Sequence, residues 1–339
     1  MAESWFKLDR NDQSEALEVA ASELGRPAHL LENDIWVVWT LDAIYQSMLG
    51  EALTFKGGTS LSKAYKLIER FSEDIDLTYD IRALVPDLLR EGNPIPLTAS
   101  QEKKISTAVR ARLPQWITET VVPILHDALQ TAGIDAQLVI GGEAQDKLLL
   151  TYPALKTGTG YAAASVLLEF GARATGEPHQ TRPISCDMAD VINEVAFPIA
   201  APRVMKAERT FWEKATAAHV YCVQGRLRGE RYSRHWYDIA AFAKSPILTQ
   251  AAEDRVLADQ VAEHKSMFFA EKDAAGNKVD YFKATSGALQ LIPEGASRKA
   301  LADDYTAMLE DGLLPIDAPD FDVLIEACAA IEKLVNQRT

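Results

Sequence analysis

FKGGTSLSKAYKLIERFSEDIDLTYD, residues 55–80, decides the fold, because it links a glycine pair to two aspartates through one apolar pattern of helical spacing. A short strand expected at 52–56 runs directly into Gly57 and Gly58. The apolar residues between 61 and 68 then mark one face of a helix of about a dozen residues, which should begin near Thr59. The order strand, glycine turn, helix and acidic strand predicts a compact site at the end of a sheet.

Asp74 and Asp76 fall one residue apart in a second expected strand, 74–79. Side chains alternate faces along a strand, so the two carboxylates share one face while Ile75 and Leu77 point into a core. Like charges this close repel unless a cation lies between them. Oxygen ligands favour magnesium or manganese over zinc. The pair therefore predicts a site for a divalent metal ion.

Gly57 and Gly58 allow a tight backbone turn, and the helix that follows directs free N–H groups toward an anion such as phosphate. Either feature alone is weak, since such turns are often plain connections and a lone pair of acids is usually surface charge. Together they describe a phosphate cradle beside a metal pair, the arrangement that a nucleoside triphosphate requires.

The remaining pattern predicts an α+β protein, with an α/β lobe at 1–200 that has a mixed sheet and a helical lobe at 201–339. Helices are expected within 13–49 and 100–131, and strands at 136–140, 147–152 and 164–170. The region 203–339 reads as almost wholly helical, with one polar break at 271–278. No internal repeat is apparent.

Composition narrows the class of protein. The chain has 339 residues, 47% of them hydrophobic, and a net charge of −14, which argues against a protein that coats nucleic acid. Its start lacks the pattern of a signal peptide, and no stretch is apolar enough for a membrane span, so a cytoplasmic protein without membrane contact is expected. Cys186, Cys222 and Cys328 lie far apart, which indicates buried thiols rather than a zinc site or disulfides.

One basic segment departs from this acidic average. Between residues 201 and 237, eight Lys or Arg face three Glu, so the segment carries a local charge of +5. A solvated helix face with exposed loop arginines would explain it, and so would an RNA-binding surface. The arginines in question are Arg226, Arg228, Arg231 and Arg234.

These motifs resemble the nucleotidyltransferase fold of the DNA polymerase β type and, more closely, the AbiEii/AbiGii toxin family, which includes the MenT toxins. FKGGTSLSKAY and RFSEDIDL look like its first two motifs. VLLEFGARATGEP (166–178) looks like the strand that supplies a third carboxylate. FWEKATAAHVY (211–221) and RHWYDIAAF (234–242) look like the third and fourth motifs. The resemblance covers about 33–336.

The resemblance implies roles for residues that match these motifs. The triphosphate would be held by Gly57, Gly58, Thr59, Ser60, Lys63, Ser72 and Lys214. Asp74 and Asp76 would bind Mg2+ or Mn2+. Glu169 takes the third acidic place, where many relatives have aspartate, so it is a metal ligand, a general base or neither. The plain structural alternative is a partly buried glutamate at a strand end.

Lys214 and Asp238 complete the catalytic set that the resemblance implies, with Asp74, Asp76 and Glu169. Lys214 repeats at i+4 after Lys206 and Thr210 on one helix face, from which it would reach a nucleotide phosphate. For Asp238 the structural alternative is a pair with Arg234, one turn earlier. The six histidines lack metal spacing, which argues against a zinc or histidine-nucleophile enzyme.

The reaction implied is transfer of a nucleoside monophosphate from an NTP to an acceptor hydroxyl, with release of pyrophosphate. Characterised toxins of the family add nucleotides to the 3′ end of tRNA and block translation, and a cognate antitoxin is the expected protein partner. The competing hypotheses are a protein AMPylator, a small-molecule nucleotidyltransferase of the antibiotic-modifying kind, and a binding module without turnover. The intact acidic pair disfavours the last of these.

Overall fold

The computed structural model describes residues 2–72, 74–156, 164–226, 231–310, 312–315 and 317–338. The chain forms two compact units. The first comprises Met1–Ala64, Ser72–Pro94 and Lys104–Met205, and the second comprises Tyr65–Phe71, Ile95–Lys103 and Lys206–Thr339. These units differ from the division expected at 200/201, because residues 201–205 lie in the first unit and two short segments, 65–71 and 95–103, lie in the second.

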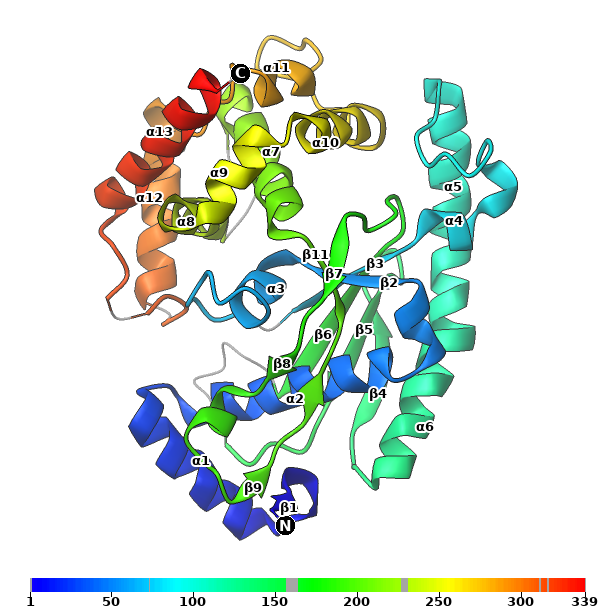
Figure 1. Ribbon diagram of the computed structural model, residues 1–339, viewed down its shortest axis with the longest axis vertical. Helices are drawn as coiled ribbons and strands as arrows, with labels where there is room; N and C mark the ends of the chain where they lie inside the picture. Colours follow the sequence, from blue (N-terminus) through cyan, green and yellow to red (C-terminus); the bar gives the residue numbers. More distant parts are fainter. Residues whose placement is uncertain are drawn as a thin grey trace. The chain divides into compact units, whose positions relative to one another are not determined.

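The first unit is built on a mixed sheet of seven strands in the order β4-β5-β6-β3-β2-β11-β7 (Figure 1). Its strands are β2 Leu53–Lys56, β3 Ile75–Tyr79, β4 Gln137–Gly141, β5 Lys147–Thr151, β6 Ser165–Gly171, β7 His179–Thr181 and β11 Arg203–Met205. β3 pairs antiparallel with β2 and parallel with β6. The α+β class with a mixed sheet is confirmed, and β7 and β11 were not predicted because three residues carry too little periodicity.

Two small ladders extend this unit. β1 Glu3–Ser4 pairs with β9 Val195–Ala196, and β8 Ile184–Ser185 pairs with β10 Ile199–Ala200. α2 packs against β6 and β10. The helices of the first unit are α1 Arg10–Leu24, α2 Ala28–Tyr45, α3 Gly57–Lys63, α4 Ile81–Leu84 and α6 Val122–Ala132, and α5 Ala99–Trp116 begins in the second unit's segment and continues into the first.

Two helix predictions need correction. The helix expected to begin near Thr59 and run about a dozen residues is α3, which begins at Gly57 and ends at Lys63. Beyond it the chain takes a positive φ of 51° at Lys66 and enters the second unit. The helical stretch expected at 100–131 is interrupted by a π-helical turn, Ile117–Val121. Pro114 precedes that turn and has no backbone N–H for the helical ladder.

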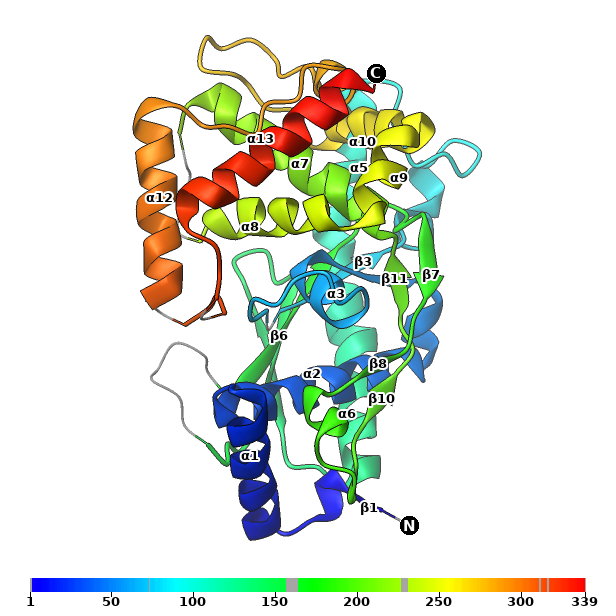
Figure 2. The same cartoon turned by 60° about the vertical axis from the view of Figure 1, so that its left-hand side comes forward.

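The second unit is a group of helices around α7 Ala207–Gln224, which contacts α8, α9, α10 and α11 (Figures 1 and 2). Its other helices are α8 Ser233–Ala241, α9 Pro246–Glu253, α10 Arg255–Phe268, α11 Tyr281–Thr285, α12 Gly295–Glu310 and α13 Phe321–Gln337. The polar break predicted at 271–278 lies between α10 and α11. The buried indole group of Trp236 is satisfied, since its Nε1 donates to the Leu291 carbonyl at 2.6 Å.

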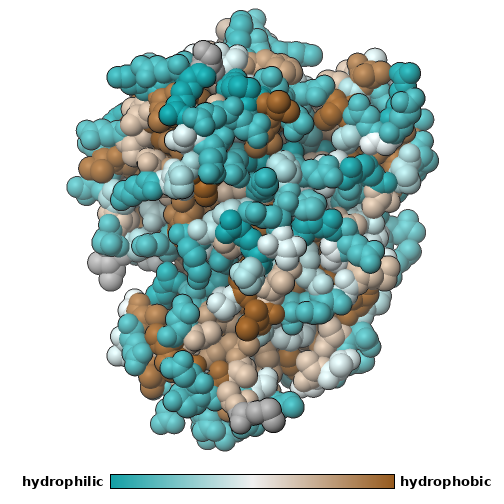
Figure 3. Space-filling view, viewed as in Figure 1, coloured by the Kyte–Doolittle hydropathy of each residue, from teal (hydrophilic) through white to brown (hydrophobic). Residues whose placement is uncertain are grey.

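Polar residues cover most of the face seen in Figure 3, and hydrophobic residues form small groups on it. The described part of the chain has no helix that is both long enough and apolar enough to cross a membrane. Cys186 and Cys328 are buried free thiols, as predicted, whereas the free thiol of Cys222 is only partly buried.

Burial of His219 on α7 makes stability depend on pH. Burial lowers the pKa of His219 to about 4, and its Nδ1 accepts a hydrogen bond from the Gln290 N–H at 3.1 Å. The unfolded chain therefore binds a proton that the folded chain does not between pH 6.5 and 4, so stability falls as pH falls through this window.

We expect His219→Gln to reduce this pH dependence. Between pH 7 and 4.5 the free energy of unfolding should fall by about 2 kcal/mol less in the variant than in the parent, measured by urea denaturation. His126→Gln, at an exposed position on α6, is the control. An unchanged pH dependence in His219→Gln would contradict a buried neutral imidazole.

Candidate active site

The acidic pair lies where β3 begins, in the middle of the first unit's sheet. Asp74 immediately precedes β3, and Asp76 is its second residue. Ile75 and Leu77 are fully buried, whereas both aspartates are only partly buried. The alternation expected from the sequence thus places both carboxylates on the face opposite the core side chains.

Asp76 belongs to a row of four charged residues that crosses the sheet. It pairs with Lys56 on β2 and with Glu169 on β6, and Glu169 pairs with Lys147 on β5. Directly paired residues of neighbouring strands share a face, so the row reads lysine, aspartate, glutamate, lysine across one surface. Sequence reasoning missed Lys56 and Lys147, because pairing between distant strands leaves no local signal.

Gly57 brings the backbone turn against the Asp76 carboxylate. Its φ is 81°, a left-handed conformation that favours glycine. A Cβ atom built on Gly57 would lie 2.0 Å from Asp76 Oδ2 and 2.8 Å from Asp76 Cγ. Both the conformation and the close approach therefore require glycine here. The glycine turn and the second aspartate form one structural unit.

Thr59 ties this turn to the start of β3. Its Oγ1 lies 2.6 Å from the Asp74 carbonyl and 2.9 Å from Ser72 Oγ, and the residue is 1% exposed. Ser60 Oγ donates in the same way to the Gly57 carbonyl at 2.9 Å. These side chains thus hold the turn in shape. The backbone N–H groups of the first turn of α3 lack acceptors within the helix, so they are the groups here that could bind a phosphate.

Lys63, at the end of α3, lies in a buried ionic cluster. Its Nζ is 2.5 Å from Asp34 on α2 and 2.7 Å from Asp187, and Arg26 also pairs with Asp187. Burial alone would lower the pKa of Lys63, but Asp34 and Asp187 more than offset it and raise that pKa. The ammonium group predicted to lie near the triphosphate is held by two carboxylates, which fasten α3 to its neighbours.

The carboxylates at this site meet only part of what a divalent cation requires. Asp74 and Asp76 are hard oxygen ligands, and Mg2+ is commonly bound by one or two carboxylates together with phosphate oxygens of the substrate. Glu169, however, forms an ion pair with Lys147. Among the residues that the structure describes, no group of three or more His, Cys, Asp or Glu side chains is arranged to hold a metal ion. The aspartate pair is thus the candidate metal site.

Glu169 lies two residues before the end of β6, and its side chain is 36% exposed. The hydrogen bond with Glu169 raises the pKa of Lys147, the more so because Asp146 and Asp74 lie nearby. Lys147 is therefore a cation at the edge of the acidic site.

Lys214 and Asp238 meet within the second unit. Asp238 is fully buried, and its Oδ2 lies 2.8 Å from Lys214 Nζ. Arg70 donates to both carboxylate oxygens, from Nε at 2.6 Å and from Nη2 at 2.8 Å. Burial would raise the pKa of Asp238, but Arg70 and Lys214 outweigh it and lower that pKa below its usual range. The alternative that Asp238 pairs with Arg234 is wrong, because Arg70 and Lys214 hold its carboxylate.

Only part of the basic segment is available as a cationic surface. Arg209 pairs with Glu213 on α7, Lys214 with Asp238, and Arg203 donates to the Gly50 carbonyl. Arg228 lies outside the described residues. The local charge of +5 therefore overstates what an RNA backbone would meet.

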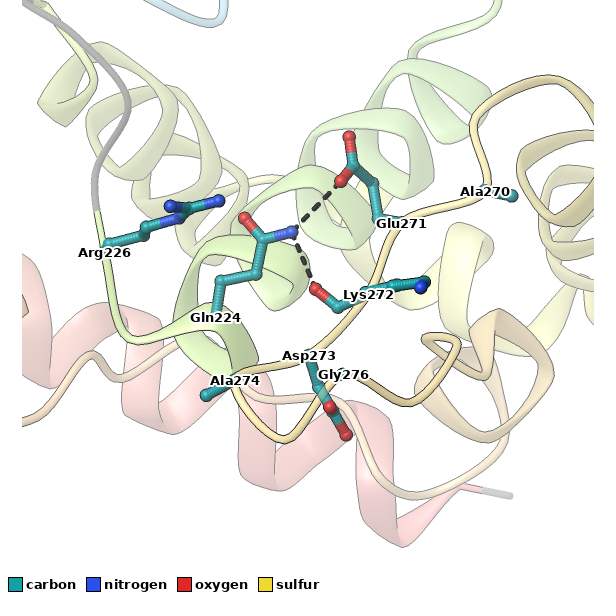
Figure 4. Close-up of a pocket in the computed structure, with 8 residues that line it drawn as sticks. All are labelled: Gln224, Arg226, Ala270, Glu271, Lys272, Asp273, Ala274 and Gly276. Atoms are coloured by element: carbon teal, nitrogen blue, oxygen red, sulfur yellow. Dashed lines mark hydrogen bonds between the residues drawn. The ribbon is translucent and has the colours of Figure 1, made fainter.

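Three of the predicted RNA-binding arginines are described. Arg226 is exposed, and it lines a cavity of about 640 Å3 at the end of α7, with Gln224, Glu271, Lys272 and Asp273 (Figure 4). Gln224 donates to Glu271 at 3.1 Å and to the Lys272 carbonyl at 2.9 Å. Arg231 precedes α8, where its backbone N–H bonds to Asp304, and Arg234 lies in the first turn of that helix.

Residues 39–327 match the family described as "Nucleotidyl transferase AbiEii toxin, Type IV TA system". The chain belongs to this family. It is accordingly a nucleotidyltransferase toxin of a type IV toxin–antitoxin system, with an NTP as substrate and an antitoxin as counterpart. The resemblance stated from the motifs alone is confirmed.

Among solved structures, the chain is similar to MenT4, a nucleotidyltransferase toxin from Mycobacterium tuberculosis. The two share 15% identity with a TM-score of 0.40, over 95% of this chain and 97% of that one. No curated protein sequence matches the chain.

The contact between Gly57 and Asp76 predicts that an added methyl group will disrupt the site. In Gly57→Ala the Asp76 carboxylate has to move, so NTP turnover should fall at least about tenfold, because even about 1 Å of misplacement at a reacting centre costs far more than that. Gly133→Ala is the matched control, since Gly133 has a φ of 66° and no atom within 4 Å of an added Cβ.

Both substitutions carry the conformational cost of a left-handed residue, of about 1 kcal/mol. Urea denaturation measures that shared cost, and labelled NTP turnover measures the site. Equal turnover by the two variants would show that the close approach does not matter.

Proposed function

We propose that this toxin transfers a nucleoside monophosphate from an NTP to the 3′ end of a tRNA, and that the modified tRNA can no longer support translation. The observation that carries the proposal is the close approach of the Gly57 turn to Asp76. The proposal is supported by the backbone N–H groups at this turn, which could bind a phosphate beside two carboxylates suited to a divalent cation. Few functions other than triphosphate chemistry need both groups at one point.

In this mechanism the 3′ hydroxyl of the acceptor loses its proton to water and attacks the α-phosphorus, a new oxygen–phosphorus bond forms, and pyrophosphate leaves with the electrons of the broken bond. The N–H groups of Gly57, Gly58 and Thr59 bind phosphate oxygens. Asp74 and Asp76 would hold Mg2+ or Mn2+, which when bound neutralises phosphate charge. Thr59 keeps the turn and the start of β3 together, through its contact with the Asp74 carbonyl.

The other predicted site residues keep roles in the proposal, but these roles differ. Ser72 lies beside the cradle, with its hydroxyl 2.9 Å from Thr59 Oγ1, and would contact a phosphate. Lys63 is proposed to act by fastening α3 rather than by touching the nucleotide. Lys214 and Asp238 keep the catalytic roles that the family resemblance implies, and Arg70 joins them as the third member of their cluster.

The positions of positively charged residues support RNA as the acceptor. Arg226, Arg231 and Arg234 lie between the end of α7 and the first turn of α8, and the cavity that Arg226 lines also carries Lys272, Glu271 and Asp273. Clustered cations in an otherwise acidic protein suit a local contact with an RNA backbone. A protein AMPylator or an antibiotic-modifying enzyme would not need them.

Loss of either aspartate should remove the activity without unfolding the protein. We expect Asp74→Ala and Asp76→Ala each to lower Mg2+-dependent NTP turnover at least about 100-fold, since a bound metal supplies several kcal/mol of charge stabilisation. Release of labelled pyrophosphate measures the turnover. Asp127→Ala, at an exposed site on α6, is the control. Parental turnover in either variant of the acidic pair would rule out its role.

The RNA acceptor is tested separately. Changing Arg226, Arg228 and Arg231 together to Ala should weaken RNA binding and flatten its salt dependence by about one unit of slope per lost contact. NTP affinity should be unchanged. Lys103, Lys104 and Arg110, changed together to Ala on α5, form a control of equal charge. The assay is transfer of each labelled NTP to host RNA across a salt series.

If a protein or a small molecule is labelled, and no RNA is labelled by any of the four NTPs, the tRNA acceptor is wrong. One of the alternative acceptors then takes its place. This outcome would leave the nucleotidyltransferase site itself intact.

A further inference from the structure

Lys147 belongs to the charged row, and the reaction described above does not use it. It lies on β5 directly opposite Glu169, and its ammonium group pairs with the Glu169 carboxylate. Glu169 in turn lies directly opposite Asp76. Glu169 therefore has Asp76 on one side and Lys147 on the other, and its carboxylate pairs with the Lys147 ammonium group.

The composition of the row explains why a lysine is needed there. Asp74 and Asp76, at the start of β3, and Glu169 on β6 place three carboxylates on one face of two neighbouring strands, and such a group repels itself in the absence of a cation. Lys56 and Lys147 stand at the two ends of the row. The sheet thus places a positive charge directly beside Glu169.

The length of the Lys147 side chain also favours its pairing with Glu169. In an antiparallel pair, side chains directly opposite each other have Cβ atoms about 5 Å apart, so the long Lys147 side chain meets the Glu169 carboxylate without bending either strand. A ligand shared with Asp74 and Asp76 would require Glu169 to turn away from this partner. Among the residues with described positions, the three acids do not form a cluster of metal ligands.

We propose that Lys147 is a positioning residue that keeps Glu169 out of the metal site, so that Asp74 and Asp76 alone bind the divalent cation from the protein side. The proposal rests on the nucleotidyltransferase site described above. It follows that the protein without NTP binds a divalent cation weakly and that the phosphate oxygens of the NTP supply further ligands, as is common for Mg2+.

The test measures Mn2+ binding directly, by the electron paramagnetic resonance signal of free Mn2+, with no NTP or RNA present. Six proteins are compared: the parent, Glu169→Gln, Lys147→Met, the double variant of these two, Lys147→Arg and Lys56→Met. The side chains of Glu169 and Lys147 are both more than a third exposed, so substitutions there should fold, and thermal unfolding verifies it. Because no transfer is assayed, the result is independent of the acceptor.

We expect Glu169→Gln to change the Mn2+ dissociation constant by less than about twofold, since Glu169 is not a ligand. Lys147→Met should tighten Mn2+ binding about fivefold by releasing Glu169, which corresponds to the strength of a partly exposed ion pair. The double variant should return to the parental value. Lys147→Arg, which keeps the cation, should also resemble the parent.

Two outcomes would overturn the proposal. If Glu169→Gln alone weakens Mn2+ binding more than about tenfold, Glu169 is a metal ligand in the parent protein. If Lys147→Met tightens Mn2+ binding equally with and without Glu169, the effect is only the loss of a nearby positive charge. Lys56→Met calibrates that general effect, because Lys56 stands at the other end of the row and does not pair with Glu169 in the sheet.

Discussion

The contact between the backbone of Gly57 and the carboxylate of Asp76 is the constraint on which the rest of the site depends. No side chain fits between them, so the turn has to be glycine and has to be left-handed. The pairing of β2 with β3 sets Lys56 opposite Asp76, and the next residue, Gly57, turns over that carboxylate. Thr59 then locks the turn to the carbonyl of Asp74. Phosphate donors and acidic ligands are thereby held at one point by backbone geometry.

Charge is arranged differently at the surface of the sheet and in the interior. In the interior, Lys63 is surrounded by two carboxylates in the first unit, and Asp238 by two cations in the second. Such clusters hold elements in place, because removing one partner leaves a buried charge uncompensated. The aspartate pair instead remains partly exposed, and its two carboxylates lie on one face of the strand. A cation bound at this pair would therefore gain the most electrostatic stabilisation.

Local features of this site could be predicted from the sequence. The glycine turn, the alternation of Ile75 and Leu77 with the two aspartates, and the ends of β2 and β3 all follow from short-range patterns. Pairing over long distances could not. Lys147 is 71 residues beyond Asp76, and Arg70 meets Asp238 across 168 residues, so nothing near either residue signals its partner. α3 is shorter than its apolar pattern predicts, because the chain leaves the helix to carry Arg70 into the second unit.

The most direct test of the central claim is a crystal structure of the protein with Mn2+ and a non-hydrolysable NTP analogue. Anomalous scattering should place Mn2+ about 2.1 Å from carboxylate oxygens of both Asp74 and Asp76, with phosphate oxygens against the backbone N–H groups that follow Lys56. The same crystals of Asp76→Asn should lose the Mn2+ peak. A triphosphate bound away from the Gly57 turn, or Mn2+ held by neither aspartate, would contradict the claim.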